Sequence, residues 1–193
     1  MKTVKYDMVN ELTIKNSKFI TLLFRIDETT DISKILSDVR IRYPKATHYC
    51  YAYITKETKR TSDDGEPGGT AGMPMLNVLE KEELINVLAI VVRYFGGIKL
   101  GAGGLVRAYS KAVREAIISN NLIDIELGYL VKVVISYDEA KNFEHLIKKY
   151  VVINKEYLDN ITYNILIPQE KVNILNNYSY QIINEEYIEK EFS

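Results

Sequence analysis

Five basic side chains occupy a stretch of the chain that contains no acidic residue. The segment between Glu83 and Glu115 is 31 residues long and carries a charge of +5. Its basic residues are Arg93, Lys99, Arg107, Lys111 and Arg114. The last three are spaced i, i+4 and i+7, so they share one face of a helix, while Lys99 lies in the loop before that helix. Because all five can converge, the segment predicts a local site for an anion.

Glycines surround these basic residues and indicate which anion the site would take. The sequence YFGGIKLGAGG contains Gly96, Gly97, Gly101, Gly103 and Gly104. A glycine-rich turn that opens a helix presents unpaired N–H groups and the positive end of the helix dipole, which commonly hold phosphate. The predicted ligand therefore bears phosphate. The alternative is that the glycines serve tight turns and close helix packing, and that the charges form a solvated basic face.

An earlier glycine-rich loop, SDDGEPGGTAGMP at residues 62–74, precedes this segment. In chain order it is the first glycine loop, which we call the acidic loop, and GGIKLGAGG is the second glycine loop. Nine of the ten glycines in the chain lie between Gly65 and Gly104. We expect the loop to border the basic site through Asp63, Asp64, Gly65, Glu66, Gly68 and Gly69. Its acids could limit which polyanions enter, or could neutralise the basic face. Carboxylates can also hold Mg²⁺, but acids beside glycine and proline usually form turns, so we predict no metal here.

Residues for conventional catalysis are few. His48 and Cys50 point the same way on a predicted strand, but a zinc site needs three or four ligands, and the second histidine, His145, belongs to a distant helix. Positions i and i+2 of a strand are about 6–7 Å apart, so His48 and Cys50 do not form a nucleophile and base pair. We predict a buried cysteine, a hydrogen-bonded histidine and no cofactor.

The opposite face of the same strand is aromatic. The segment HYCYAYI (48–54) places three side chains there, Tyr49, Tyr51 and Tyr53. Such a row could stack RNA bases, although packing beneath a helix is the more common use of aromatic strand residues. Both interpretations stay open at this point.

Periodicity predicts the elements that would position these residues. The first part reads as strand 17–26, helix 31–43, strand 48–54, helix 73–81, strand 84–95 and helix 105–121. LINVLAIVVRYF, residues 84–95, is almost continuously apolar, as expected of a strand covered on both faces. A central strand, a glycine loop and a basic helix therefore follow one another directly.

The remainder of the chain has a different pattern. From Gly128 it reads as strand 129–136, helix 138–150, strand 151–158, strand 161–167, helix 168–178 and strand 179–192. This βαββαβ order is typical of a ferredoxin-like sheet with two helices on one face. We therefore predict an α+β protein with two domains, 1–127 and 128–193.

Composition limits the class of protein. A chain of 193 residues with 47% hydrophobic content can bury a substantial core. The net charge of −1 excludes a uniformly basic surface, so a polyanion must be met by a local patch. Residues 1–127 hold 18 basic and 16 acidic residues, whereas 128–193 hold 7 and 10. One cysteine, no apolar leader and no long apolar run favour a cytoplasmic protein without a membrane span.

The segments SDDGEPGGTAGMPML and VVRYFGGIKLGAGGLVRAYSKAV strongly resemble the YigZ/IMPACT family, and SKFI and HYCYAY fit its flanking strands. The match covers roughly residues 17–120. The resemblance implies an N-terminal domain of the left-handed βαβ kind seen in the second domain of ribosomal protein S-five. It also implies a ferredoxin-like C-terminal domain similar to the last domain of elongation factor G.

The resemblance further implies a link to translation and a positively charged groove for nucleic acid, which maps onto Arg93, Lys99, Arg107 and Lys111. Eukaryotic relatives restrain a stress kinase and carry an extra N-terminal partner-binding domain that has no counterpart here, so that role is not transferred. Tyr49 stands where many relatives have a second histidine. Some relatives bear a proline-dipeptidase label, and this chain shows no ligand set for that activity.

These observations predict a non-enzymatic accessory or regulatory protein of translation, which binds RNA or ribosome phosphates through a basic glycine-rich cleft. The partner could also be a translation factor or another protein, which would make the chain a protein-interaction module. A further alternative is an enzyme or binder for a small phosphorylated ligand or nucleotide. GGIKLGAGG matches neither G-x-x-x-x-G-K-[ST] nor G-x-G-x-x-G, so no nucleotide signature supports that alternative.

Overall fold

The computed structural model describes residues 1–118 and 121–190. It divides into two compact units, Met1–Ile123 and Asp124–Ser193. The predicted boundary at Gly128 lies inside a strand, β7 (Leu122–Ile135), so the division falls earlier in the chain than expected. Among the described residues, no helix is long and apolar enough to cross a membrane.

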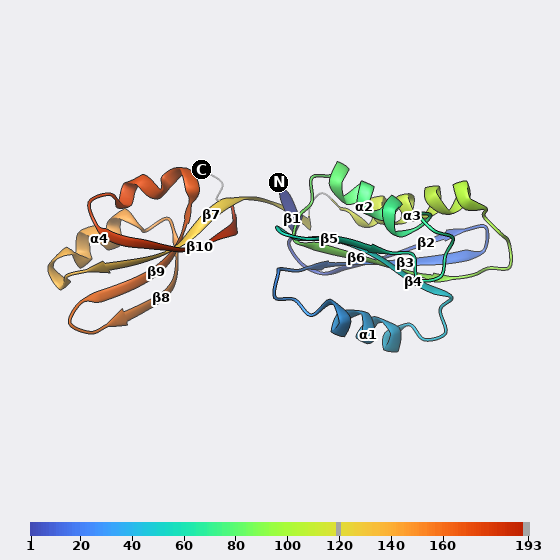
Figure 1. Ribbon diagram of the computed structural model, residues 1–193, viewed down its shortest axis with the longest axis horizontal. Coiled ribbons are helices and arrows are strands. Elements are labelled where there is room, and N and C mark those ends of the chain that lie inside the picture. The colour runs from blue at the N-terminus through green and yellow to red at the C-terminus, as the bar shows by residue number, and fades with distance from the viewer. Residues whose placement is uncertain (119–120, 191–193) are drawn as a thin grey trace. The chain divides into compact units, whose positions relative to one another are not determined.

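The first unit is a five-stranded sheet with helices on both faces. Its elements are β1 (Lys2–Val4), β2 (Met8–Ile14), β3 (Ser17–Arg25), α1 (Ile32–Arg42), β4 (His48–Ile54), β5 (Lys59–Ser62), α2 (Gly72–Lys81), β6 (Val87–Tyr94) and α3 (Ala102–Ala116). The strand order of the sheet is β2-β3-β6-β4-β5, and β1 is not one of its strands. Figure 1 shows α1 on one face of this sheet and α2 and α3 on the other.

The central strand is β6, as the apolar run predicted. It pairs antiparallel with both β3 and β4, so these two strands run parallel with β6 between them and are joined through α1. Every residue from Val87 to Val92 is fully buried because helices cover both faces of the strand. The strand therefore carries the chain from a buried core directly to the second glycine loop.

The helix on the other side of that loop differs from its prediction at both ends. α3 begins at Ala102, so Gly103 and Gly104 belong to its first turn, and it ends at Ala116. Residues 119–120 of the predicted helix 105–121 lie outside the described residues. The strands β1, β2 and β5 were not predicted at all.

The second unit confirms the predicted βαββαβ order. Its elements are β7, η2 (Tyr137–Glu139), α4 (Ala140–Leu146), β8 (Val151–Tyr157), β9 (Ile161–Pro168), η3 (Gln169–Leu175) and β10 (Ser179–Glu189). The strand order is β8-β9-β7-β10 with antiparallel neighbours, which is the ferredoxin-like arrangement. The predicted second helix is a 3₁₀ segment, and residues 191–192 of the predicted last strand lie outside the described residues.

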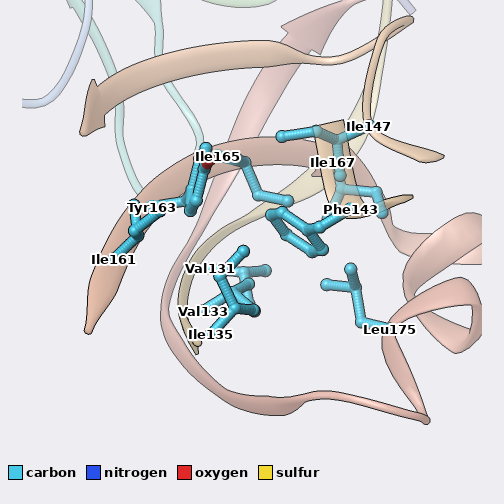
Figure 2. Close-up of a cluster of buried hydrophobic side chains, with 10 residues drawn as sticks. All are labelled: Val131, Val133, Ile135, Phe143, Ile147, Ile161, Tyr163, Ile165, Ile167 and Leu175. Carbon is cyan, nitrogen blue, oxygen red and sulfur yellow. The ribbon is translucent and has the colours of Figure 1, made fainter. Parts of the chain in front are cut away.

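The core of the second unit lies between one face of this sheet and its helical segments. Phe143 and Ile147 from the α4 region and Leu175 from η3 pack on alternate residues of β7 and β9 (Figure 2). The ring of Phe143 lies edge-on to Tyr163, with 4.9 Å between the ring centroids. The alternation that predicted these strands is therefore the pattern that builds the core.

Candidate functional site

Helix α3 presents the predicted basic face to solvent. Its buried side is made of six residues: Leu105, Ala108, Tyr109, Ala112, Val113 and Ala116. Arg107, Lys111 and Arg114 are exposed on the opposite side. The helical spacing therefore correctly predicted that the three cations share one exposed face. Lys99, in the loop before the helix, is exposed as well.

The first turn of α3 begins in the glycine loop without a capping side chain. The N-cap residue, Gly101, has a φ of 71°, a left-handed conformation that glycine adopts without strain. Among the described residues, the structure shows no side-chain capping hydrogen bond at this N-terminus. A Cβ atom added at Gly103 would lie 3.6 Å from Nη1 of Arg107. The Arg107 guanidinium therefore lies beside the first helical turn, where an anion would meet both.

Acidic residues neutralise little of this surface. Lys111 lies 3.5 Å from the Glu115 carboxylate, and both side chains are about half exposed. Lys99, Arg107 and Arg114 form no ion pair with the residues that the structure describes. The basic face of α3, which we define as Lys99, Arg107, Lys111 and Arg114, therefore retains most of its charge.

Arg93 does not belong to that surface, which corrects the prediction that it helps to hold an external anion. The residue is only 4% exposed. Its Nη1 donates to Oε1 of Glu66 at 2.5 Å, and its Nη2 donates to the Ser17 hydroxyl at 3.3 Å. The guanidinium charge is therefore balanced inside the protein, and Arg93 supports the site from below.

Glu66 is the centre of a buried polar cluster that the sequence did not predict. Besides Arg93, its Oε1 accepts a hydrogen bond from the Tyr109 hydroxyl at 2.8 Å. Nε2 of His48 lies 3.7 Å from Oε2, and Nδ1 of His48 lies 2.9 Å from the Asp64 carbonyl oxygen. Glu66 was expected at the border of the site, and it instead joins the loop to β4, β6 and α3.

The neighbouring thiol and phenol are held in their neutral forms. The Cys50 thiol donates to the Asp63 carbonyl at 3.0 Å, and Cys50 Sγ lies 3.3 Å from the Tyr109 hydroxyl. Burial raises the pKa of Cys50 to about 12. Burial, followed by the nearby Cys50 and Glu66, also raises the pKa of Tyr109 well above its ordinary value. Cys50 is buried and His48 hydrogen-bonded, as the sequence predicted.

The acidic loop is folded around Asp63. Its carboxylate accepts hydrogen bonds from the N–H groups of Gly69, Ala71 and Gly72 at 2.8–3.0 Å. Partial burial opposes ionisation, but these bonds outweigh it and lower the pKa of Asp63 below its ordinary value. Asp63 therefore acts as the turn former that the sequence predicted.

The other two acids of the loop are also paired within the protein. Asp64 accepts from the Tyr49 N–H at 2.6 Å and from Arg40 at 2.8 Å. Glu66 is paired with Arg93, as described above. None of the three carboxylates forms an ion pair with the basic face of α3, so the neutralisation that the sequence left open does not occur among the described residues.

The two glycine loops are connected through side chains. Glu66 from the first loop pairs with Arg93, Arg93 donates to Ser17, and the Ser17 hydroxyl accepts from the N–H of Gly96 in the second loop. Gly96 is pressed against the turn between β2 and β3, because a Cβ there would lie 2.0 Å from the carbonyl carbon of Asn16. The second loop is thereby anchored where it leaves β6.

The other glycines in the predicted set have less restrictive surroundings. Gly65, Gly69 and Gly97 have positive φ values of 86°, 76° and 83°, which are the values that favour glycine in turns. A Cβ at Gly68 would meet nothing within 4 Å. A Cβ at Gly104 would lie 3.1 Å from the Cβ of Leu100, which is a tight contact. Turn geometry therefore accounts for part of the glycine clustering.

The tyrosine row packs beneath a helix and is not free to stack bases. Tyr49 is 7% exposed, and Tyr51 and Tyr53 are partly buried against the same core, which includes Val39 of α1. The Arg40 guanidinium lies 4.3 Å from the centroid of the Tyr49 ring. Packing against α1 is therefore the correct one of the two interpretations.

The two histidines belong to different units of the protein. His145 belongs to α4 in the second unit, whereas His48 belongs to β4 in the first. Within residues 1–118 and 121–190, no group of three or more histidine, cysteine, aspartate and glutamate side chains is placed to hold a metal ion.

Comparison with known proteins gives a consistent family assignment. The model of the Impact N-terminal domain matches residues 15–117. The Bacillus subtilis (strain 168) protein "IMPACT family member YvyE" is 34% identical over 187 residues, which are 94% of this chain and 86% of the relative. A Haemophilus influenzae "IMPACT family member" is 38% identical over 156 residues, which cover 77% of this chain and 74% of the relative.

A solved structure extends the comparison to the fold. The crystal structure of a hypothetical protein is 28% identical to this chain with a TM-score of 0.64, and the match covers 95% of this chain and 97% of the other. It supports the α+β architecture, in which an Impact N-terminal domain is followed by a second sheet domain. Since the domain model matches more than half of the chain and the relatives cover most of it, the protein belongs to the IMPACT family.

Proposed function

We propose that this protein binds RNA, free or within the ribosome, through phosphate contacts to the basic face of α3, as a non-catalytic accessory protein of translation. The observation that carries the proposal is the set of exposed cations along α3 and in the loop before it, three of which form no ion pair with the described residues. The uncapped N–H groups of that turn add hydrogen-bond donors. Arrays of Lys and Arg side chains are the usual basis of phosphate contacts in nucleic-acid binding.

The acidic loop supports this proposal because its three carboxylates are paired within the protein. Asp63, Asp64 and Glu66 are held by backbone N–H groups, Arg40 and Arg93 respectively. They are therefore not available to cancel the charge of α3. Glu66 of the loop instead binds Arg93 of β6 and Tyr109 of α3. The acidic loop therefore helps to hold in place the strand and the helix that the second glycine loop connects.

The link to translation rests on the family resemblance, and the second unit has a separate role in the proposal. Residues 128–193 carry 7 basic and 10 acidic residues, which disfavours a second phosphate surface. We assign this unit to a translation-factor or other protein partner. The RNA contact is therefore attributed to the first unit alone.

Charge reversal tests the proposed site. The variant Lys99→Glu with Arg107→Glu should lose binding to labelled structured RNA and to purified ribosomes, because two attractive contacts become repulsive. Its matched control is Lys148→Glu with Lys149→Glu, which changes the charge equally at exposed positions of the second unit. Thermal melting verifies that both variants are folded.

The control variant should bind like the wild type. If the Lys99 and Arg107 variant also retains full binding to RNA and ribosomes, the site assignment is wrong. If the wild type binds neither, the proposed function itself fails, and a protein partner or a small phosphorylated ligand becomes the better explanation.

A further inference from the structure

An exposed aromatic ring stands at the start of the basic loop, and the phosphate contacts give it no role. Phe95 directly follows β6 and is 46% exposed. Side chains alternate along this strand: Arg93 faces Glu66 and Tyr109, whereas Tyr94 packs with the core on the α1 side. Phe95 returns to the side of Arg93, whose guanidinium lies 5.6 Å from the Phe95 ring centroid. The ring is therefore on the same side of the sheet as α3.

The backbone that carries this ring is fixed on both sides. The Phe95 N–H donates to the Thr47 hydroxyl at 3.0 Å, and the Gly96 N–H donates to the Ser17 hydroxyl at 3.2 Å. Gly96 also lies in close contact with the backbone of Asn16. An aromatic ring on a fixed backbone has few side-chain torsions left to order, so a ligand can pack on it at low entropic cost.

The loop that carries the ring and the helix that follows it combine exposed apolar side chains with positive charge. Ile98 is 46% exposed in the same loop, Val106 is 37% exposed on α3, and Lys99 and Arg107 lie next to them in sequence. The phosphate backbone of a continuous duplex would engage the cations but leave Phe95 without a partner. An unpaired nucleotide offers both a base with a π face and an adjacent phosphate. The pairing of an exposed ring with cations therefore favours a nucleic acid with unpaired bases over an apolar protein surface.

We propose that Phe95 is a stacking platform for an unpaired base, so that the site takes single-stranded or looped RNA in preference to duplex. This inference rests on the proposed function, because the phosphates of that same RNA would contact Lys99 and Arg107. It adds a requirement that the phosphate site alone does not make: a ring, and not only charge, is needed for binding.

Three substitutions of Phe95 distinguish the contribution of its aromatic π face to binding from that of its apolar volume. Phe95→Ala removes the side chain, Phe95→Leu keeps apolar volume but removes the π face, and Phe95→Tyr keeps the ring. Ile98→Ala is the matched control, since Ile98 has the same exposed fraction in the same loop. Anisotropy titrations use a labelled unstructured oligonucleotide and the same sequence annealed to its complement, and melting curves verify folding.

Phe95→Ala and Phe95→Leu should weaken binding of the single strand by roughly 5- to 150-fold, the equivalent of one base–aromatic stack. Phe95→Tyr and Ile98→Ala should stay close to the wild type. Duplex binding should be weaker than single-strand binding and insensitive to Phe95.

Three results would overturn the inference. Unchanged single-strand binding by Phe95→Ala, while the Lys99→Glu with Arg107→Glu variant loses binding, would retain the phosphate site and remove the stacking platform. Equal affinity of the wild type for single strand and duplex would remove the preference. Loss of ribosome binding by Phe95→Ala with oligonucleotide binding intact would assign the ring to a ribosomal protein. Failure of the proposed function would instead appear as no binding of RNA or ribosomes by the wild type, and failure of the phosphate site as RNA binding that ignores Lys99 and Arg107.

Discussion

Arg93 and Arg107 lie in the same acid-free segment of the sequence, yet one is buried in an ion pair and the other is exposed to solvent. Arg107 is exposed beside the first turn of α3, whereas Arg93 is 4% exposed and paired with Glu66. The helical spacing of Arg107, Lys111 and Arg114 was sufficient to predict their shared face. The burial of Arg93 depends on the carboxylate of Glu66, which lies 27 residues earlier in the chain. A local sequence pattern could not predict that contact.

The buried pair predicts a large loss of stability when one member is removed. Arg93→Ala should lower the free energy of unfolding by about 3–5 kcal/mol, because Glu66 would remain buried without its cation. Chemical denaturation of the purified variant measures this loss. Combining Arg93→Met with Glu66→Gln should recover a substantial part of it, since the substituted amide would be neutral and could still accept from Tyr109.

A small effect of Arg93→Ala would contradict a structural role for the pair. Binding experiments should leave Arg93 unchanged, so that weaker affinity is not confused with impaired folding.

At the scale of elements, the prediction succeeded where one pattern dominated. The apolar run of β6 and the amphipathic stripe of α3 identified both elements. β2 was missed because it is a half-buried edge strand with Glu11 and Asn10 among its residues, and β5 because it is only four residues long. Phe95 was not singled out either, although alternation along β6 could have placed it on the α3 side.

The loop between β6 and α3 predicts that Gly96 tolerates no side chain. Gly96→Ala should destabilise the protein by about 1–3 kcal/mol or more, because its Cβ would overlap the backbone of Asn16. Gly68→Ala is the matched control, since a Cβ there meets nothing within 4 Å and should be nearly neutral. Thermal melting compares the two, and equal melting temperatures would contradict the close approach.

The hydrogen bonds of the acidic loop predict that the free energy of unfolding depends on pH through the ionisation of Asp63. Its pKa is lowered below the ordinary 3.8 in the folded protein, so its stabilising contribution is present above that value and is lost as the pH falls through the folded pKa. Asp63→Asn should cost about 1–3 kcal/mol near neutral pH, because a neutral amide accepts the N–H bonds of Gly69, Ala71 and Gly72 less well. The difference between variant and wild type should shrink below about pH 4.

Urea denaturation of both proteins across that pH range measures the difference directly. A free-energy gap that stays constant down to the lowest accessible pH would show that the Asp63 charge does not hold the loop. A gap that widens on acidification would contradict the sign of the shift.

At the scale of the whole molecule, the division into two units was visible in the sequence. Glycine is concentrated before Gly104, and after Gly128 a regular alternation of strands and helices begins. Alternate burial along β7 and β9 is local, so the ferredoxin-like order could be predicted from the sequence. The strand that spans the predicted boundary, β7, begins at Leu122, before the alternation that suggested a division at Gly128.

In the proposed function, the basic face of α3 in the first unit binds the phosphates. The most direct test of this claim is the salt dependence of RNA affinity for the wild type and for a variant in which Lys99, Arg107, Lys111 and Arg114 are alanine. The control replaces four exposed lysines of the second unit, Lys141, Lys148, Lys149 and Lys190. Both variants remove four positive charges, so only their location differs.

Fluorescence anisotropy of a labelled single strand over a range of salt concentrations gives the slope of log affinity against log salt. We predict that the slope becomes shallower by about 0.7 for each phosphate that the α3 variant no longer neutralises, and stays at the wild-type value in the control. Equal slopes for the wild type and the α3 variant, in proteins that melt normally, would contradict the claim that this face binds phosphates.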